Sequence, residues 1–199
     1  RTVETLKSTV KKIYAALRHT EKHVADDYAF AKRLLPEKIT FVTSQELEDK
    51  YPDLTAKERE YKAAKEHGAI FLMQIGGALK SGKPHDGRAP DYDDWTLNGD
   101  LLLWNDTLGH ALEISSMGIR VDAAALARQL SAADAEDRMQ YPYHQAIADG
   151  SLPLTIGGGI GQSRLCMLML EKAHIGEVQV SIWPPETVEE CAAHGITLL

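Results

Sequence analysis

The sequence has few cysteines and no long apolar run. Its only two cysteines, Cys166 and Cys191, have the spacing of neither a disulfide framework nor a zinc site, so we expect a reducing, cytoplasmic setting. No stretch approaches the roughly 18 consecutive apolar residues of a membrane-spanning helix. The first residues, RTVE, lack the apolar core of a signal peptide. We therefore expect a soluble, untargeted protein without a membrane partner.

An excess of basic residues is also missing. Lysine and arginine number 22 against 29 aspartates and glutamates, which gives a formal net charge of −7. Because nucleic-acid binders neutralise phosphates with clustered basic residues, we expect no nucleic-acid partner. The 44% hydrophobic and 26% charged composition argues against a disordered, collagen-like or coiled-coil chain. A length of 199 residues suits one domain.

Apolar periodicity predicts several helices. Apolar side chains recur at three- and four-residue steps over residues 3–17, which predicts an opening helix packed on a core. A second helical stretch is expected to run towards Leu35 and to stop by Pro36, whose ring disfavours helical geometry before it. Two more helices are expected after Asp122 and before Gly150.

Two capping boxes mark the start of two further helices. Thr43 with Glu46, and Thr55 with Glu58, each place a hydroxyl and a carboxylate where the first free amides of a helix need partners. The second of these helices should end at Gly68.

Five segments have the composition or the alternation of strands. Residues 39–43 and 69–75 are short apolar runs rich in strand-forming side chains. Residues 100–104 and 110–116 flank a short turn and predict a hairpin. Residues 177–182 alternate between polar and apolar side chains. Together with the helices, these strands predict an α+β fold with a largely antiparallel sheet, although a mixed sheet also fits.

A glycine-rich segment leads into a predicted helix at its C-terminal side. Missing side chains let a backbone approach a ligand closely, and the first amides of a helix favour an anion. No lysine follows as in a P-loop, and Arg164 stands where a dinucleotide-binding loop needs its third glycine. Arg164 could stack on a base or pair with a phosphate; alternatively, the glycines permit tight packing beside a surface arginine. The glycines are Gly157, Gly158, Gly159 and Gly161.

The predicted hairpin carries a pair of acidic residues. If residue 102 faces residue 113 and residue 100 faces residue 115, Asp100 and Glu113 lie on one sheet face as diagonal neighbours, roughly 7–8 Å apart. Converging carboxylates suit Mg²⁺, which takes one or two of them together with phosphate oxygens. A shift of one residue would place Glu113 on the other face. Two solvent-facing acids are the alternative.

A third set combines arginines, acids and hydroxyls around the same hairpin. A zwitterionic amino acid requires a guanidinium for its carboxylate and a carboxylate for its ammonium group. A solvated acidic loop is the alternative interpretation. The set consists of Arg88, Asp91, Asp93, Asp94, Ser115, Ser116 and Arg120.

Four motifs in sequence order carry a resemblance to a known family. They are RAPDYDDW at 88–95, LNGD at 97–100, EISSMGIRVD at 113–122 and GGGIGQSRL at 157–165. Together they resemble ammonia-dependent asparagine synthetase, the aspartate–ammonia ligase family, and the similarity runs along nearly the whole chain. The resemblance implies the catalytic core of class II aminoacyl-tRNA synthetases, an antiparallel sheet flanked by helices.

The resemblance also implies a reaction and its cofactors. Aspartate would attack the α-phosphate of ATP to give a β-aspartyl adenylate and pyrophosphate, and ammonia would then displace AMP to give asparagine. Asp100 and Glu113 would hold Mg²⁺, while Arg164 and the glycines would bind ATP. Catalytic roles would belong to Asp93, Arg120 and Arg164. Substrate-binding roles would belong to Arg88, Asp91, Asp93, Ser115, Ser116 and Arg120.

Two departures from the family pattern accompany the resemblance. Family members are longer, so we expect residues 1–199 to form a single catalytic domain that lacks an N-terminal portion. Only Thr96 stands between Trp95 and Leu97, where the family carries a longer loop. We expect a homodimer that takes aspartate, ammonia and ATP. The alternative is a non-catalytic paralogue acting as a small-molecule binding or interaction module.

Overall fold

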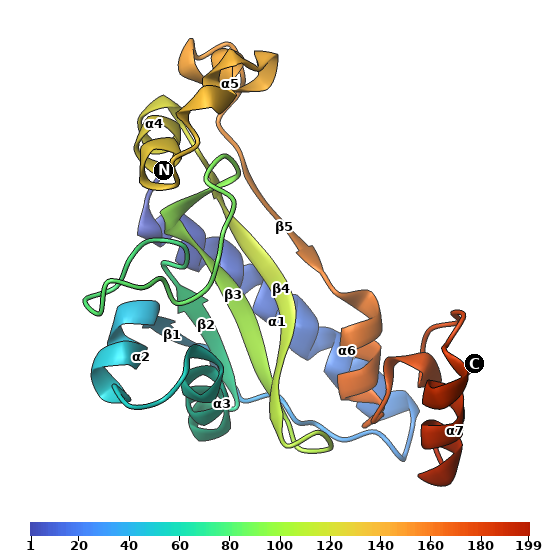
Figure 1. Cartoon of the computed structure of the whole chain (residues 1–199). Helices are drawn as coiled ribbons and strands as arrows, with labels where there is room; N and C mark the ends of the chain where they lie inside the picture. The colour runs from blue at the N-terminus through green and yellow to red at the C-terminus, as the bar shows by residue number, and fades with distance from the viewer.

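A five-stranded sheet forms the centre of the computed structural model, which describes residues 1–199 (Figure 1). The strands are β1 (Thr40–Thr43), β2 (Ala69–Met73), β3 (Asp93–Asn105), β4 (His110–Arg120) and β5 (Ile156–Ile160). The helices are α1 (Val3–Asp27), α2 (Ser44–Lys50), α3 (Ala56–His67), α4 (Ala123–Ala132), η1 (Glu136–Gln140), α5 (Pro142–Ala148), α6 (Gln162–Met169), η2 (Ile175–Glu177) and α7 (Pro185–Ala193). None of the helices is long and apolar enough to cross a membrane.

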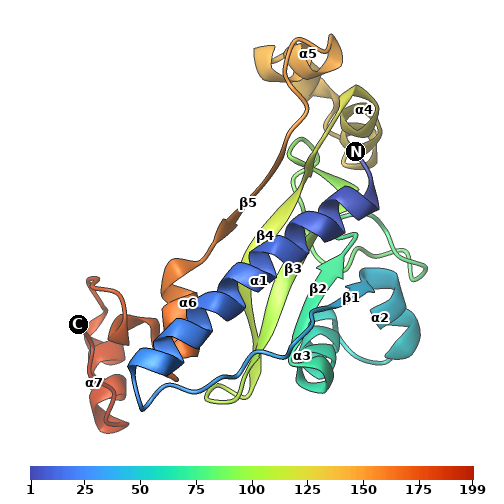
Figure 2. The same cartoon turned by 180° about the vertical axis from the view of Figure 1, so that it is seen from behind.

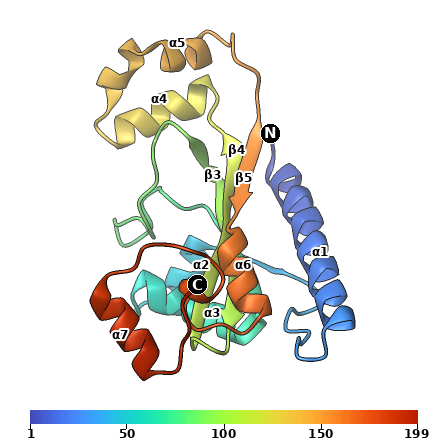
Figure 3. The same cartoon turned by 90° about the vertical axis from the view of Figure 1, so that its right-hand side faces the viewer.

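The strand order follows the chain order. β1 pairs parallel to β2, and the pairs β2–β3, β3–β4 and β4–β5 are antiparallel. The sheet is therefore largely antiparallel with one parallel pair, which confirms the predicted α+β fold. The views in Figures 2 and 3 show α1 along one face of the sheet, with α2 and α3 on the other.

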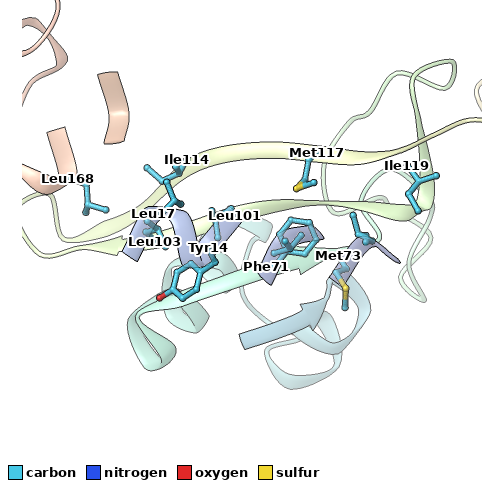
Figure 4. Close-up of a cluster of buried hydrophobic side chains, with 13 residues drawn as sticks. Tyr14, Leu17, Phe71, Met73, Leu101, Leu103, Ile114, Met117, Ile119 and Leu168 are labelled. Atoms are coloured by element: carbon cyan, nitrogen blue, oxygen red, sulfur yellow. The ribbon is translucent and has the colours of Figure 1, made fainter. Parts of the chain in front are cut away.

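The opening helix packs as its periodicity predicts. Leu6, Val10, Tyr14 and Leu17 are buried against strand residues of the α1-facing layer (Figure 4). Thr2 caps the helix by accepting a hydrogen bond from the backbone N–H of Thr5. This layer forms the largest of the three hydrophobic clusters, so α1 fixes one face of the sheet.

The expected second helix before Pro36 does not form. The chain leaves α1 at Asp27 and remains without helix up to β1. Glu21 explains the difference, because its carboxylate accepts hydrogen bonds from the backbone amides of Leu34 and Leu35 at 2.6 and 2.8 Å. These amides are therefore bound to a side chain of α1 rather than to a helical carbonyl.

The other predicted helix boundaries are confirmed. Both capping boxes are present, at Thr43 with Glu46 and at Thr55 with Glu58. Gly68 ends α3 with a φ of +74°, a left-handed conformation that favours glycine. The helices expected after residue 122 and before residue 150 are α4 and α5.

The strand expected at 177–182 is wrong. Glu177 instead closes η2, because its carboxylate accepts from the backbone amides of Ala173 and His174. The chain that follows pairs with no strand, and the side chains of Val180 and Ile182 are 76% and 98% exposed. Alternation alone predicts a strand only where a neighbouring strand is available for pairing.

Candidate active site

The register of the β3–β4 hairpin decides which side chains share a face. Leu102 pairs with Glu113, as predicted, but a bulge follows, so Leu101 pairs with Ser115 and Asp100 with Ser116. Leu102 packs with the α3 side and Leu101 with the α1 side. Because side chains alternate along a strand, Asp100, Glu113 and Ser116 share the face of α2 and α3.

The predicted pairing of residue 100 with residue 115 is therefore wrong. Ser115 is buried opposite Leu101, whose side chain lies in the α1-facing core. The bulge shifts Ser116 by one position and leaves Ser115 on the far face of the sheet. The side chain of Ser115 thus lies on the opposite face from Asp100 and Glu113, and its substrate-binding role stays a prediction.

Asp100 is a buried carboxylate on this face. The guanidinium of Arg88 forms an ion pair with its Oδ2, and Ser116 is the residue opposite Asp100 on the neighbouring strand. Burial raises the pKa of Asp100, and the negative charge of Glu113 adds to this, while Arg88 acts in the opposite direction. Its Oδ1 is buried and has no hydrogen-bond partner. A buried carboxylate with a free oxygen and a raised pKa would be stabilised by a cation.

Arg88 comes from the long segment between β2 and β3, which we call the 74–92 loop. Three helices hold this loop through buried side chains. Glu48 of α2 accepts from the Ser81 hydroxyl at 2.7 Å, and Glu60 of α3 lies 3.0 Å from His85 Nε2. Gln129 of α4 donates to the carbonyl of Pro90 at 2.8 Å. The loop is thus fixed at three points along its length by hydrogen bonds to buried side chains.

Arg164 meets Glu113 at one end of the hairpin face. The Arg164 Nη1 donates to the Glu113 carbonyl oxygen at 3.0 Å and lies 3.9 Å from its Oε1. The Arg164 side chain is half-exposed, so its remaining N–H groups stay available to a ligand. α6 begins directly after β5, which pairs with β4 and brings Arg164 to this place.

The glycines before α6 serve two purposes. A Cβ at Gly158 would lie 2.3 Å from the Cβ of Met117, and one at Gly157 would lie 2.6 Å from the Arg120 guanidinium. These two glycines allow close strand packing, the alternative that the sequence left open. A Cβ at Gly159 would meet nothing, and Gly161 lies beside Arg164. The open space over Gly159 is available to a ligand.

Arg120 and Asp93 form a second charged group at the other end of the hairpin. Their side chains form an ion pair, and the Arg120 guanidinium also stacks 3.9 Å from the Tyr92 ring centre. Its Nη2 donates to the Tyr92 hydroxyl at 3.0 Å. Burial raises the pKa of Asp93 despite the opposing effect of Arg120. Sequence reasoning gave no role to Tyr92, because a stacking arginine 28 residues away has no local signal.

Asp91 lies outside this group. Its carboxylate is 2.8 Å from Arg138 Nη1 and 3.0 Å from His144 Nε2. Partial burial acts to raise the pKa of Asp91, but the hydrogen bonds from Arg138 and His144 lower it overall. Asp91 therefore attaches the 74–92 loop to η1 and α5, and its contact with a substrate stays a prediction.

Asp94 begins a bulge at the position where this chain has only Thr96 between Trp95 and Leu97. Asp93 pairs with Arg120 and Asn98 with Gly118, so residues 94–97 lie opposite the single Ile119. Asp94 is buried and accepts from both the backbone N–H and the hydroxyl of Thr96, at 3.0 and 2.7 Å. Asp94 is thus a structural residue of the bulge.

The site is elongated. It runs along β4 from Glu113, past Ser116 opposite Asp100, to Arg120. At about 3.3 Å per residue, the seven steps from Glu113 to Arg120 cover at most about 23 Å. This length accommodates an extended ligand with several charges, or two ligands placed end to end.

The donor set fits a hard divalent cation. Asp100 and Glu113 offer carboxylate oxygens on one face, and the free Oδ1 of Asp100 is the group that lacks a partner. No group of three or more His, Cys, Asp or Glu side chains converges as a protein-only metal site would need. Mg²⁺ fits such a pair, because it is bound by one or two carboxylates together with substrate phosphates.

Sequence comparisons identify close relatives of the chain. A family model described as aspartate-ammonia ligase matches residues 1–195. Curated relatives named aspartate–ammonia ligase are 60% identical in Levilactobacillus brevis and 55% identical in Clostridium perfringens strain SM101. Both matches cover 100% of this chain and 59% of the relative. The chain thus spans about three fifths of the length of these relatives.

Solved structures show the same fold. Asparaginyl-tRNA synthetase of Entamoeba histolytica, in complex with asparaginyl-adenylate, superposes with a TM-score of 0.62 at 18% identity, covering 88% of this chain and 43% of that one. Aspartyl-tRNA synthetase from the same organism gives 0.61 at 18% identity, with 94% and 41% covered. The predicted class II synthetase-like core is confirmed. On the family match and the relatives' identity, this chain belongs to the aspartate–ammonia ligase family.

Proposed function

We propose that the whole protein makes asparagine from aspartate and ammonia with ATP, through a β-aspartyl adenylate, releasing AMP and pyrophosphate. One observation carries the proposal beyond family membership. Asp100, Glu113 and Arg164 lie on one sheet face, and the Arg120–Asp93 pair lies further along the same hairpin. This is the arrangement needed to place a nucleotide and an amino acid end to end.

The ATP end is the end of Glu113 and Arg164. The planar guanidinium of Arg164 can stack on a base or bind phosphate oxygens with two N–H groups. The open space over Gly159 lets the nucleotide approach the backbone of β5. Asp100 and Glu113 would hold Mg²⁺, which when bound would offset charge on the phosphates. Arg88, already paired with Asp100, adds a fixed positive charge beside the α-phosphate position.

The aspartate end is the end of Arg120 and Asp93. Arg120 can bind a carboxylate of the amino acid and Asp93 its ammonium group. The β-carboxylate oxygen would then attack the α-phosphorus near Ser116 and Arg88, and pyrophosphate would leave. Ammonia next attacks the β-carbonyl carbon, AMP leaves, and one proton is lost. No covalent bond to the enzyme is needed in either step.

The proposal extends to the assembly and setting of the whole protein. We propose a cytoplasmic homodimer, as the family resemblance implies. Sedimentation analysis of the full-length protein would test this, because a monomer at micromolar concentration would contradict it.

A single incubation tests the reaction. The full-length protein is mixed with ATP, Mg²⁺, aspartate and ammonium, and both AMP and asparagine are measured. Equal amounts of the two, dependent on aspartate and ammonium, support the proposal. Binding of ATP or aspartate without formation of AMP would overturn it and favour the non-catalytic binding module.

A further inference from the structure

Lys57 is a cation beside the ATP end that sequence reasoning did not single out. It lies in the first turn of α3, and its side chain is 59% exposed. Its Nζ donates to Glu60 Oε2 at 2.8 Å, while the other oxygen of Glu60 lies 3.0 Å from His85 Nε2. Because Glu60 and His85 are both buried, they hold the ammonium group of Lys57 in one place.

The stripe of α3 that carries Lys57 runs along the hairpin. Lys65 lies over the Trp104 ring at 5.3 Å, and one turn earlier Tyr61 stacks on His110 at 5.4 Å between ring centres. Lys57 is a further turn earlier on the same helix face. Since α3 packs on β4, Lys57 lies one helical turn beyond the contact of Tyr61 with His110, on the side of Glu113.

The electrostatics agree with this placement. Partial burial alone would lower the pKa of Lys57, but the Glu60 hydrogen bond and the charges of Glu60, Asp86 and Glu113 raise it. Lys57 therefore stays charged near the pair of carboxylates that would hold Mg²⁺. A lysine has three N–H donors, and Glu60 uses only one. Two donors remain for a ligand.

We propose that Lys57 binds the β- and γ-phosphate oxygens of ATP, and equally the pyrophosphate product. The inference rests on the proposed function and adds a residue from α3 to its ATP site. Asp86 and Glu113 both act on Lys57, and Glu113 also acts on Asp100, so the phosphates of ATP need cations that offset these carboxylates. The aspartate end lies too far along β4 for Lys57 to serve it, since Arg120 is seven residues from Glu113.

Glu60 and His85 are positioning residues in this scheme. The His85 Nε2 lies against Glu60, while its Nδ1 is buried without a partner. The contact with the Glu60 carboxylate needs a hydrogen-bond donor at the Nε2 position of residue 85. His85→Gln keeps a donor at nearly the same position, whereas His85→Ala removes it. Gln should therefore retain the pyrophosphate affinity that Ala loses.

The test compares pyrophosphate, ATP and AMP binding to full-length wild-type protein and to Lys57→Ala, by titration calorimetry with Mg²⁺ and without aspartate. Loss of one charge-assisted hydrogen bond should weaken ATP and pyrophosphate at least about tenfold. The affinity for AMP should change less than about twofold, because AMP has no β- or γ-phosphate. The KM for aspartate, measured in the ligase assay, should also change less than about twofold, because aspartate binds at the other end of the site. Lys57→Arg should keep most of the affinity.

Lys62→Ala is the matched control. Lys62 lies on the same helix, but its ammonium group sits 4.8 Å from the Tyr51 ring. It should bind pyrophosphate as wild type does. Unchanged ATP and pyrophosphate affinity in Lys57→Ala, or an increase in the aspartate KM instead, would overturn the inference.

The outcomes separate this inference from the proposed function. If wild-type protein forms asparagine while Lys57→Ala binds pyrophosphate normally, only the role of Lys57 is wrong. If wild-type protein binds pyrophosphate through Lys57 but forms no asparagine, the proposed function is wrong and the phosphate contact stands.

Discussion

The 74–92 loop and strand β5 line the same site but are held in different ways. Three buried side chains from α2, α3 and α4 form hydrogen bonds with the loop. They are Glu48, Glu60 and Gln129. β5 is held by its backbone pairing with β4, and most of its residues are exposed. The position of Arg88 therefore depends on a buried polar network, whereas that of Arg164, at the start of α6, depends on the backbone pairing of β5 and on the apolar contacts of Leu165 and Leu168.

This difference teaches where mutations should act. Substitutions of the buried side chains that hydrogen-bond to the loop should reduce the free energy of unfolding, because they leave buried polar groups without partners. Changes on the open part of β5 and the start of α6 should reduce ligand binding and activity while the fold persists. Four predictions test this division in order of decreasing effect.

Arg164→Ala should cause the largest loss. It removes the guanidinium at the ATP end, and we expect aspartate-dependent ATP–pyrophosphate exchange to fall about 10²- to 10³-fold. Arg164→Lys should restore only part of the activity, because the planar fork is lost. The free energy of unfolding should hardly change, since Arg164 is half-exposed. Exchange at the wild-type rate in the Ala variant would contradict the assignment.

Gln129→Ala should cause the largest loss of stability. The side chain of Gln129 donates to the carbonyls of Pro90 and Asp93 and accepts from the backbone N–H of Trp95. Removing it leaves two buried carbonyls and one part-buried amide without their partner, and urea unfolding should show a loss of about 3 kcal/mol. Gln129→Glu is a second probe, because it keeps the acceptor but loses both donated bonds. A loss of less than about 1 kcal/mol in the free energy of unfolding of the Ala variant would show that Gln129 does not hold the loop in place.

Two neighbouring glycines give a matched pair on β5. Gly158→Ala places a Cβ against Met117, so we expect a loss of about 1–3 kcal/mol in the free energy of unfolding. Gly159→Ala meets no atom and should unfold like wild type, while its affinity for ATP falls. Thermal unfolding and ATP titration separate the two effects. Equal stability of both variants would argue against close packing at Gly158.

The pH dependence of stability should show the smallest effect. Burial raises the pKa of Asp100 above the ordinary value of 3.8, so the folded state favours the protonated carboxyl. Its contribution to stability is therefore fully present below 3.8 and is lost as the pH rises through the folded pKa. Asp100→Asn should remove this contribution, and urea unfolding from pH 4 to 7 should show a smaller decline than in wild type. A steeper decline in the variant would mean that Arg88 outweighs burial.

The elements with local signals were predicted from the sequence. The stripe of α1, the capping boxes at Thr43 and Thr55, and the stop at Gly68 each depend on residues a few positions apart. The shared face of Asp100 and Glu113 was also predicted, because only the turn and the alternation along the strands decide it. For these features, short-range geometry is sufficient.

The remaining features depend on partners far along the chain. Asp91 was assigned to substrate, but its partners Arg138 and His144 lie 47 and 53 residues away. The sequence before Pro36 has the pattern of a helix, but the carboxylate of Glu21 accepts hydrogen bonds from its backbone amides. Tertiary contacts decided the outcome at each of these places, and a local pattern carries no information on them.

The bulge at Ile114 and Ser115 has a consequence for which changes the hairpin can tolerate. Glu113 and Ser116 are an odd number of residues apart, yet both face the same side, because the extra residue corrects the alternation. Deleting one residue there would leave Glu113 in place and turn the side chains of Ser116 and Arg120 towards the hydrophobic core beneath α1. The nucleotide and amino-acid halves of the site would then point in opposite directions. Strand length at this point is thus a stricter requirement than the identity of the residues that fill it.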